Sequence, residues 1–261
     1  MKTFLWVNPS RDPGGAVTKR VGETLETVGI TIAPRLAQAD FVVVIGGDGT
    51  ILQCAKEAAP LGIPIVGVNM GRIGFIAELE PNELELLQNI AEGDYELEER
   101  MMLDVSVVED GRIAHRDIAL NDAVISGDAT AQVVDLAFYA DGELLTAFTG
   151  DGVVISTPTG STGYAMSAGG PIIEPQARNI AVTPICPHGF KARAFLLSET
   201  RVVKVEPRSS KGLYLTVDGR TAVALNEKQL IEVRMSEHTC KLIRVKNRNF
   251  YQVISEKLGR L

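Results

Sequence analysis

The sequence predicts an α/β protein with an N-terminal parallel sheet, covered by helices on both faces, and a second, mostly antiparallel β domain. Apolar strands and amphipathic helices alternate through about the first ninety residues, which is typical of a doubly wound parallel sheet. From about Met101 onward, apolar and polar residues alternate within extended runs, and three Asp-Gly pairs separate such runs. An Asp-Gly pair between alternating runs indicates a tight β-hairpin.

Each element of the first domain has its own signal. The apolar run Phe41–Ile45 is typical of a strand that is buried on both faces. Val17, Val21, Leu25 and Val28 recur at spacings of four, four and three, which places them on one face of a helix. Strands are expected at 3–7, 41–45 and 63–68, and helices at 17–28, 51–59 and 83–92.

The second domain is recognised from its expected hairpins. The Asp-Gly pairs are Asp110-Gly111, Asp141-Gly142 and Asp218-Gly219. The sequence predicts domain ranges of 1–97 and 98–246, with residues 247–261 returning to pack on the first domain. Within that last range, residues 250–261 are expected to form a strand end followed by a short helix.

The charge of the chain argues against two classes of partner. Its 261 residues include 26 basic and 33 acidic side chains, a net charge of −7, and only 5% are aromatic. Nucleic acids and anionic membranes both favour a basic face, and base stacking needs aromatic rings. We therefore expect no nucleic acid partner and no membrane partner, whereas a small phosphorylated ligand needs only a local site.

The cysteines and the N-terminus predict a cytoplasmic protein. Cys54, Cys186 and Cys240 are widely spaced and form no CxxC pair, which is typical of reduced thiols in the cytosol. The first expected strand begins at Thr3, so we expect no signal peptide, and no apolar run approaches the length of a membrane span.

The strongest chemical signal is Gly46-Gly47-Asp48-Gly49-Thr50, directly behind the buried strand 41–45. Open α/β sheets bind ligands at such strand-to-helix turns, where glycine lets the backbone approach a phosphate and the helix N-terminus offers free N–H groups. Asp48 would repel a phosphate, so its presence makes chemical sense if it binds a metal or accepts a proton. The plain alternative is a tight turn without function.

Three further segments carry candidate functional residues. Asn69–Phe75 is a second glycine-bearing turn behind an apolar strand, and Asn121-Asp122 follows a short apolar run. Asp151–Tyr164 is a strand followed by a loop of hydroxyls and glycines, and it leads into a helix expected at about Thr162–Ala168. Such a loop can hold phosphate or sugar hydroxyls, and the Tyr164 ring could lie against a purine. Taken singly, Asn121-Asp122 could be a turn or capping pair, Tyr164 a core residue and Arg72 a surface side chain.

Several familiar chemistries are excluded by the motifs. The chain has no GxxxxGK[ST] sequence, and the glycine pattern beginning at Gly47 lacks the last glycine of GxGxxG. His115, His188 and His238 are isolated, which argues against a zinc site. The segment around Ser161 is not a GxSxG nucleophile turn.

Taken together and in this order, the four segments resemble those of NAD kinases over roughly residues 40–175. The GGDGT element is shared with diacylglycerol and sphingosine kinases and, in variant form, with phosphofructokinases. The STPTGSTGY stretch that begins at Ser156 is far more specific to NAD kinases. The resemblance implies a Rossmann-like N-terminal domain, a C-terminal β domain with the site between them, and assembly as homodimers or homotetramers.

The resemblance also implies a reaction and its residues. NAD kinases phosphorylate the 2′-hydroxyl of the adenosine ribose of NAD, with ATP as donor and Mg²⁺ or another divalent cation, and they produce NADP. By this resemblance Asp48 is the general base, Gly49 allows close approach, and Asn121 and Asp122 hold the adenine and ribose. The other residues implied to line the dinucleotide site are Asp151, Thr162, Gly163, Tyr164 and Ser167. No metal ligand is assigned, because the donor phosphates can supply most of them.

Three positions depart from the family pattern. Asp122 stands where many members have Glu, Gly163 where Ala is common, and Thr149 where some members have a basic residue. The sequence leaves open whether polyphosphate replaces ATP and whether NADH is accepted. A lipid kinase with the same GGDGT turn and a non-catalytic NAD or NADP sensor are the two alternative functions.

Overall fold

The computed structural model describes residues 1–71, 74–127, 133–188, 192–208, 212–246 and 250–259. The chain divides into two compact units. Unit 1 comprises Met1–Arg100 and His238–Leu261, and unit 2 comprises Met101–Glu237. The predicted fold class is confirmed, since unit 1 carries a parallel sheet with helices and unit 2 carries antiparallel strands.

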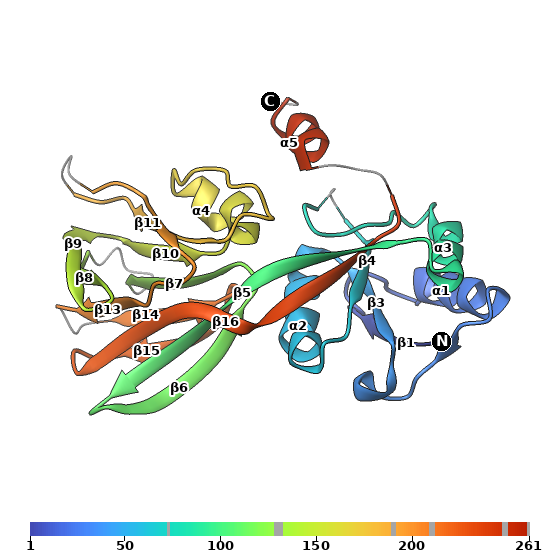
Figure 1. The fold of residues 1–261 in the computed structure, drawn as a ribbon, viewed down its shortest axis with the longest axis horizontal. Helices are drawn as coiled ribbons and strands as arrows, with labels where there is room; N and C mark the ends of the chain where they lie inside the picture. Colours follow the sequence, from blue (N-terminus) through green and yellow to red (C-terminus); the bar gives the residue numbers. More distant parts are fainter. Residues whose placement is uncertain (72–73, 128–132, 189–191, 209–211, 247–249, 260–261) are drawn as a thin grey trace. The chain divides into compact units, whose positions relative to one another are not determined.

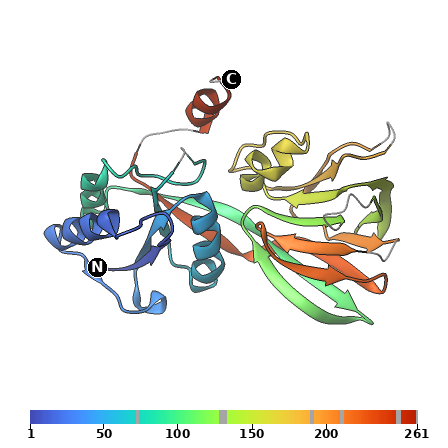
Figure 2. The ribbon, with the colours of Figure 1, turned by 180° about the vertical axis from the view of Figure 1, so that it is seen from behind.

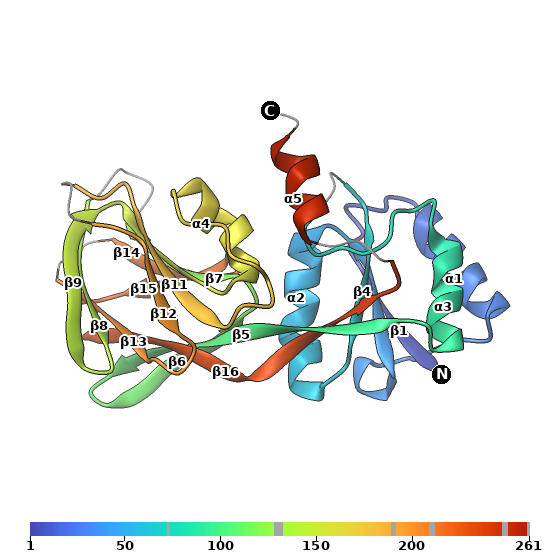
Figure 3. The ribbon, with the colours of Figure 1, turned by 45° about the horizontal axis from the view of Figure 1, so that its top comes forward.

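Unit 1 is built around a parallel sheet with the strand order β2-β1-β3-β4, and the end of β16 lies parallel to β4. Helices α1 and α3 lie on one face of this sheet and α2 on the other (Figures 1 and 3). The elements are β1 Lys2–Val7, α1 Ala16–Thr27, β2 Thr31–Ile32, β3 Phe41–Gly46, α2 Asp48–Ala58, β4 Ile65–Asn69, α3 Leu87–Glu92 and α5 Phe250–Leu258.

The predicted burial patterns of unit 1 are confirmed. All residues of β3 are buried, because helices cover both faces of the sheet at this strand. Val21 and Leu25 of α1 are 0% exposed and pack with α3 residues against the sheet. The two-residue strand β2 was not predicted, since its residues are exposed at the sheet edge and too few to form a pattern.

Unit 2 contains two antiparallel layers. One has the strand order β16-β13-β8-β9 with β5 and β6 beside β16, and the other has the order β12-β11-β10-β7-β14-β15. Strands from both layers share one apolar core, so unit 2 is a sandwich (Figure 2). The strands are β5 Glu96–Glu109, β6 Arg112–Ala119, β7 Asp122–Gly127, β8 Val134–Ala140, β9 Glu143–Gly150, β10 Gly152–Ser156, β11 Asn179–Ile185, β12 Phe195–Ser198, β13 Val203–Pro207, β14 Leu213–Val217, β15 Arg220–Leu225 and β16 Gln229–Arg244.

The three predicted Asp-Gly hairpins are confirmed. They connect β5 to β6, β8 to β9 and β14 to β15. Asp110, Asp141 and Asp218 have φ values of 50°, 51° and 51°, and the glycine after each also has positive φ. A two-residue hairpin turn with positive φ at both positions matches the right-handed twist of the strands, and aspartate and glycine tolerate it best.

Two predicted helical segments differ from the structure. The helix expected at 162–168 is instead a 3₁₀ turn, η4 (Thr159–Thr162), followed by one turn of α-helix, α4 (Tyr164–Ser167). Gly163 separates them because its backbone leaves the helical region, with φ −96° and ψ −128°. The strand end expected at Phe250 is wrong, because α5 already begins there.

None of the helices in the described ranges has the length and apolar character that crossing a bilayer requires.

Candidate active site

Asp48 begins α2 directly after β3, at the carboxyl end of the parallel strands. Its side chain is fixed by backbone donors of residues 74–77, which we call loop 74–77. The Phe75 N–H donates to Asp48 Oδ2 at 2.7 Å, and the Ile76 N–H donates to Oδ1 at 3.4 Å. The half-buried carboxylate therefore has a defined orientation, and its remaining lone pairs can accept a further proton or hydrogen bond.

Gly74 leaves the space that the Asp48 carboxylate occupies. A Cβ built on Gly74 would lie 2.0 Å from Asp48 Oδ1 and 2.6 Å from Cγ, so any other residue would displace one of the two groups. At Gly49, by contrast, a Cβ would meet no atom of the described residues within 4 Å. Packing within the chain therefore explains glycine at position 74 but not at position 49.

Polar side chains join the neighbouring strand ends at this edge of the sheet. Asn8, behind β1, donates from Nδ2 to Thr50 Oγ1 at 3.1 Å. Asn69, the last residue of β4, is 2% exposed and donates from Nδ2 to Glu80 Oε1 at 3.0 Å. The carboxyl ends of strands in an open α/β sheet are the usual place for ligands. Arg72 and Ile73 of the predicted 69–75 turn lie outside the described residues.

In unit 2, the hydroxyl and glycine loop packs directly against Asn121. Asp122 lies opposite Ser156 in the β7–β10 pairing, so the loop after Ser156 starts beside Asn121. The Thr157 N–H donates to the Asn121 carbonyl at 2.9 Å, and a Cβ on Gly160 would lie 2.2 Å from that carbonyl oxygen. The structure thus brings together two segments that the sequence identified separately.

The Asn121 side chain has an unused acceptor. Its Oδ1 atom is buried and has no hydrogen-bond partner among the described residues. Buried polar atoms in proteins are almost always hydrogen-bonded, so an orphaned carbonyl oxygen beside a loop is a candidate ligand contact. An amino or hydroxyl group of a ligand would satisfy it.

Asp218 is a functional candidate that the sequence analysis treated only as a turn residue. Its buried carboxylate accepts the backbone N–H groups of Leu120 at 3.0 Å, Asn121 at 2.8 Å and Asp122 at 3.1 Å. An ionised acceptor with three backbone donors fixes the chain at this point strongly. Its partners are 96 to 98 residues away, so no local sequence signal could have identified the role.

Asp122 is a buried acid with a shifted pKa. Burial and, to a lesser extent, the neighbouring negative charge of Asp218 together raise the pKa of Asp122 to about 7. Near neutral pH the Asp122 carboxyl can therefore either donate or accept a hydrogen bond.

The residues of η4 and α4 lie around the same loop. Thr162 is buried and donates from Oγ1 to the Thr159 carbonyl at 3.2 Å. A Cβ on Gly163 would lie 3.5 Å from Asn121 Nδ2, and Ser167 is exposed. Tyr164 is 47% exposed, so the alternative that it is a core residue is wrong.

Asp151 is separated from this group within the chain. It precedes Gly152, which pairs with Ser126, whereas Asp122 and Ser156 pair at the opposite end of the same two strands. The five residues of β10 correspond to a separation of about 16 Å at roughly 3.3 Å per residue. Asp151 instead accepts a hydrogen bond from the thiol of Cys186, and this bond raises the pKa of Cys186.

The described residues contain no group of three or more His, Cys, Asp or Glu side chains that could hold a metal ion. Asp48 and Asp122 are candidate single ligands at most. A divalent cation that arrives with a substrate can take ligands from the substrate phosphates and from water.

Comparison with protein families covers both units. The ATP-NAD kinase N-terminal domain model matches residues 10–95, and the ATP-NAD kinase C-terminal domain model matches residues 120–245. The chain is 38% identical over 235 residues to the NAD kinase of Natranaerobius thermophilus, which covers 89% of this chain and 82% of the relative. It is 37% identical over 255 residues to the NAD kinase of Heliobacterium modesticaldum, with coverage of 97% and 90%.

Solved structures give the same picture for the fold. An NAD kinase from Archaeoglobus fulgidus in complex with ATP superposes with a TM-score of 0.81 at 28% identity and covers all of both chains. Yeast NADH kinase complexed with NADH superposes with a TM-score of 0.89 at 21% identity, covering 99% of this chain and 87% of the yeast protein. At that identity the yeast structure supports the fold alone.

Proposed function

This chain belongs to the NAD kinase family, and from that membership we propose which of its residues carry out the family's reaction. The resemblance inferred from the four motifs is confirmed. The enzyme is a phosphotransferase that transfers the γ-phosphoryl group of ATP to the 2′-hydroxyl of the adenosine ribose of NAD and produces NADP.

Asp48 acts as the general base in this proposal. A ribose hydroxyl is a poor nucleophile at neutral pH, so a carboxylate that accepts its proton accelerates the transfer. The observation that carries the proposal is the Asp48 carboxylate, oriented by two backbone N–H groups at the carboxyl end of β3. The N-terminus of α2 offers further N–H groups, which suits the phosphates of the donor nucleotide.

Asn121 and Asp122 hold the adenosine of NAD. The buried, unpaired Oδ1 of Asn121 suits the amino group of adenine, because it needs a donor and adenine provides one. Asp122 can share a proton with a ribose hydroxyl, since its raised pKa of about 7 makes both protonation states accessible. Its side chain is one methylene shorter than the Glu of many members, so the ribose must lie closer to the β7 backbone.

The other site residues line the rest of the dinucleotide. Thr162, Gly163, Tyr164 and Ser167 are proposed because their segment lies beside Asn121 and leaves the Tyr164 ring exposed for stacking. Gly49 is proposed to allow close approach, since a Cβ there would meet none of the described residues within 4 Å. Asp151, a β-strand length away, can contact only a part of the dinucleotide remote from the adenosine.

The donor set fits a divalent cation that arrives with ATP. Mg²⁺ usually keeps several waters and binds substrate phosphates together with one or two carboxylates. When bound, Mg²⁺ neutralises the developing charge on the transferred phosphoryl group. Asp48 remains responsible for the proton of the ribose hydroxyl.

We further propose that the enzyme acts in the cytoplasm as a homodimer or homotetramer. The compositional support for the location is the set of three free cysteines, typical of a reducing compartment. The support for assembly is family membership. Light scattering on the purified protein, at concentrations used for activity, measures the oligomer size.

The activity is tested by incubating the protein with NAD, ATP and Mg²⁺. NADP is measured with an NADP-specific dehydrogenase, and phosphorus NMR assigns the new phosphate to the 2′ position. Parallel reactions with diacylglycerol as acceptor, polyphosphate as donor and NADH in place of NAD define the specificity. We expect NADP from NAD and no phosphorylated lipid. Lipid phosphorylation without NADP formation would favour the lipid kinase alternative, and NAD binding without turnover would favour a sensor.

A further inference from the structure

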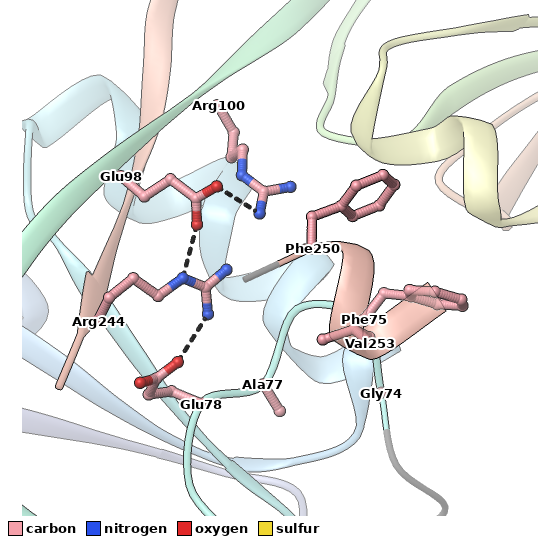
Figure 4. A pocket seen from close by; sticks show the side chains of 9 residues that line it. All are labelled: Gly74, Phe75, Ala77, Glu78, Glu98, Arg100, Arg244, Phe250 and Val253. Carbon is pink, nitrogen blue, oxygen red and sulfur yellow. Dashed lines mark hydrogen bonds and ion pairs between the residues drawn. The ribbon is translucent and has the colours of Figure 1, made fainter. Parts of the chain in front are cut away.

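Arg244, the last residue of β16, lies in a network of charged side chains in unit 1. Its Nε donates to Glu98 Oε2 at 2.6 Å, and a terminal nitrogen pairs with Glu78 Oε2 at 3.1 Å. Glu98 also pairs with Arg100 at 2.8 Å. Figure 4 shows these four side chains along one side of a pocket, with Phe75 and the α5 residues across from them.

The network fixes the Arg244 side chain. Arg244 is 17% exposed and Glu78 is 7% exposed, so both charges are largely removed from water. Glu78 Oε1 accepts the backbone N–H groups of Val245 at 3.0 Å and Lys246 at 2.8 Å, which holds the carboxylate in place.

The pKa of Glu98 is lowered overall. Burial by itself would raise this pKa, but the charges and hydrogen bonds of Arg244 and Arg100 outweigh burial. The Glu98 carboxylate therefore stays charged.

The same guanidinium group also contacts loop 74–77. The terminal nitrogen that pairs with Glu78 donates to the Ile76 carbonyl at 2.9 Å. The N–H of Ile76 donates to Asp48 Oδ1 at 3.4 Å, and the preceding N–H, that of Phe75, donates to Asp48 Oδ2 at 2.7 Å. A single residue therefore links the guanidinium to the carboxylate, with its carbonyl on one group and its N–H on the other.

We propose that Arg244 is a positioning residue that orients Asp48 through the backbone of loop 74–77. The inference rests on the proposed role of Asp48 as general base. Among the described residues Arg244 forms no hydrogen bond or ion pair with Asp48, and it acts on the loop whose two N–H donors hold the carboxylate. Its fork geometry lets one group bond Glu98, Glu78 and the Ile76 carbonyl together, which the single ammonium of lysine cannot reproduce.

The test variant is Arg244→Lys, which keeps the positive charge between Glu78 and Glu98 but loses the fork. The matched control is Arg201→Lys in unit 2, because Arg201 forms an exposed ion pair with Asp141 and, among the described residues, has no hydrogen bond or ion pair with a proposed site residue. We expect the kcat of Arg244→Lys to fall about 10- to 100-fold, with NAD affinity within about twofold of the wild type. The control should keep both.

A double-mutant cycle with Asp48→Asn separates positioning from a general loss of structure. If Arg244 acts through Asp48, Arg244→Lys should cost little further rate in the Asp48→Asn background. Equal fold-losses in kcat in both backgrounds would overturn the proposal, as would a folded Arg244→Lys enzyme with unchanged kcat.

If Arg244→Lys fails to fold, Glu98→Gln tests the proposal instead, because it weakens the contact that holds Arg244 and keeps Arg244 itself. We expect a smaller fall in kcat with NAD affinity retained, and an unchanged kcat would overturn the proposal.

Amide hydrogen exchange provides a readout that does not need turnover. We expect faster exchange in peptides that cover Phe75 and Ile76 of Arg244→Lys than in the wild type or Arg201→Lys. Unaltered exchange in these peptides would overturn the proposal. If the wild type made no NADP, the general-base role of Asp48 would fail by itself, and faster exchange would still support the link from Arg244 to Asp48.

Discussion

At the scale of single residues, the candidate chemistry depends on how each carboxylate is held. Asp48 is oriented by backbone donors and by the missing side chain at Gly74, whereas Asp122 is buried beside another acid. The sequence motifs identified Asp48, Asn121 and Asp122 because their types and order are local. They could not identify Asp218, since its contacts join residues almost a hundred positions apart.

Replacing Gly74 with alanine should impair turnover without unfolding the protein. The new Cβ would lie 2.0 Å from Asp48 Oδ1, so the carboxylate must move. A displacement of about 1 Å at a reacting group can cost roughly 10²-fold in rate, and we expect a kcat loss of that order. The control is Gly22→Ala in α1, where a Cβ meets nothing within 4 Å and kcat should not change. Equal kcat values in the two variants would contradict the role of Gly74.

The raised pKa of Asp122 predicts a pH-dependent stability difference. Its pKa rises from 3.8 to about 7 on folding, so between these values the folded state keeps a proton that the unfolded state has lost. The wild type is therefore destabilised progressively as the pH rises from about 4 to about 7, and the full penalty is on the order of 4 kcal/mol. Asp122→Asn cannot ionise and avoids it.

Chemical denaturation of both proteins at pH 5 and pH 8 measures this difference. We expect the free energy of unfolding of Asp122→Asn, relative to the wild type, to be more favourable at pH 8 than at pH 5. A difference that does not change with pH would show that the Asp122 pKa is not raised.

At the scale of secondary-structure elements, local signals predicted turns and buried strands well. Each Asp-Gly pair forms the expected hairpin turn, and the apolar run at β3 is fully buried. The helix expected at 162–168 was not found in that form, because Gly163 and the buried hydroxyl contacts of η4 favour a 3₁₀ turn over a regular helix. Glycine disfavours a helix through its backbone freedom, whereas threonine hydroxyls can compete for backbone hydrogen-bonding groups, and these propensities alone do not place the break.

The β14–β15 turn should matter more than the other hairpin turns. Asp218→Asn keeps a residue that tolerates positive φ but removes the negative charge that accepts three backbone N–H groups. We expect the free energy of unfolding to fall by about 1–3 kcal/mol and NAD affinity to decrease. Asp110→Asn is the matched control, because Asp110 has the same turn geometry at an exposed position. Similar small effects in both variants would contradict the special role of Asp218.

At the scale of the whole molecule, the periodic pattern of apolar residues was sufficient to predict the fold class but not to predict the long strands. The β-α alternation predicted the parallel sheet of unit 1, and the alternating runs predicted the antiparallel layers of unit 2. Strands β5 and β16 each contribute residues to both units, and β16 is 16 residues long. Their burial changes from one unit's core to the other's, so no single alternation pattern runs through them.

The most direct test of the central claim is the kinetic effect of Asp48→Asn, compared with its effect on NAD affinity. The asparagine keeps an oxygen that can accept the Phe75 N–H, so the loop contact is retained while the proton acceptor is lost. We predict that kcat for NADP formation falls about 10²–10⁴-fold while the Kd for NAD stays within about twofold. An unchanged kcat, or a fall that parallels a loss of NAD binding, would contradict the assignment of Asp48 as the general base.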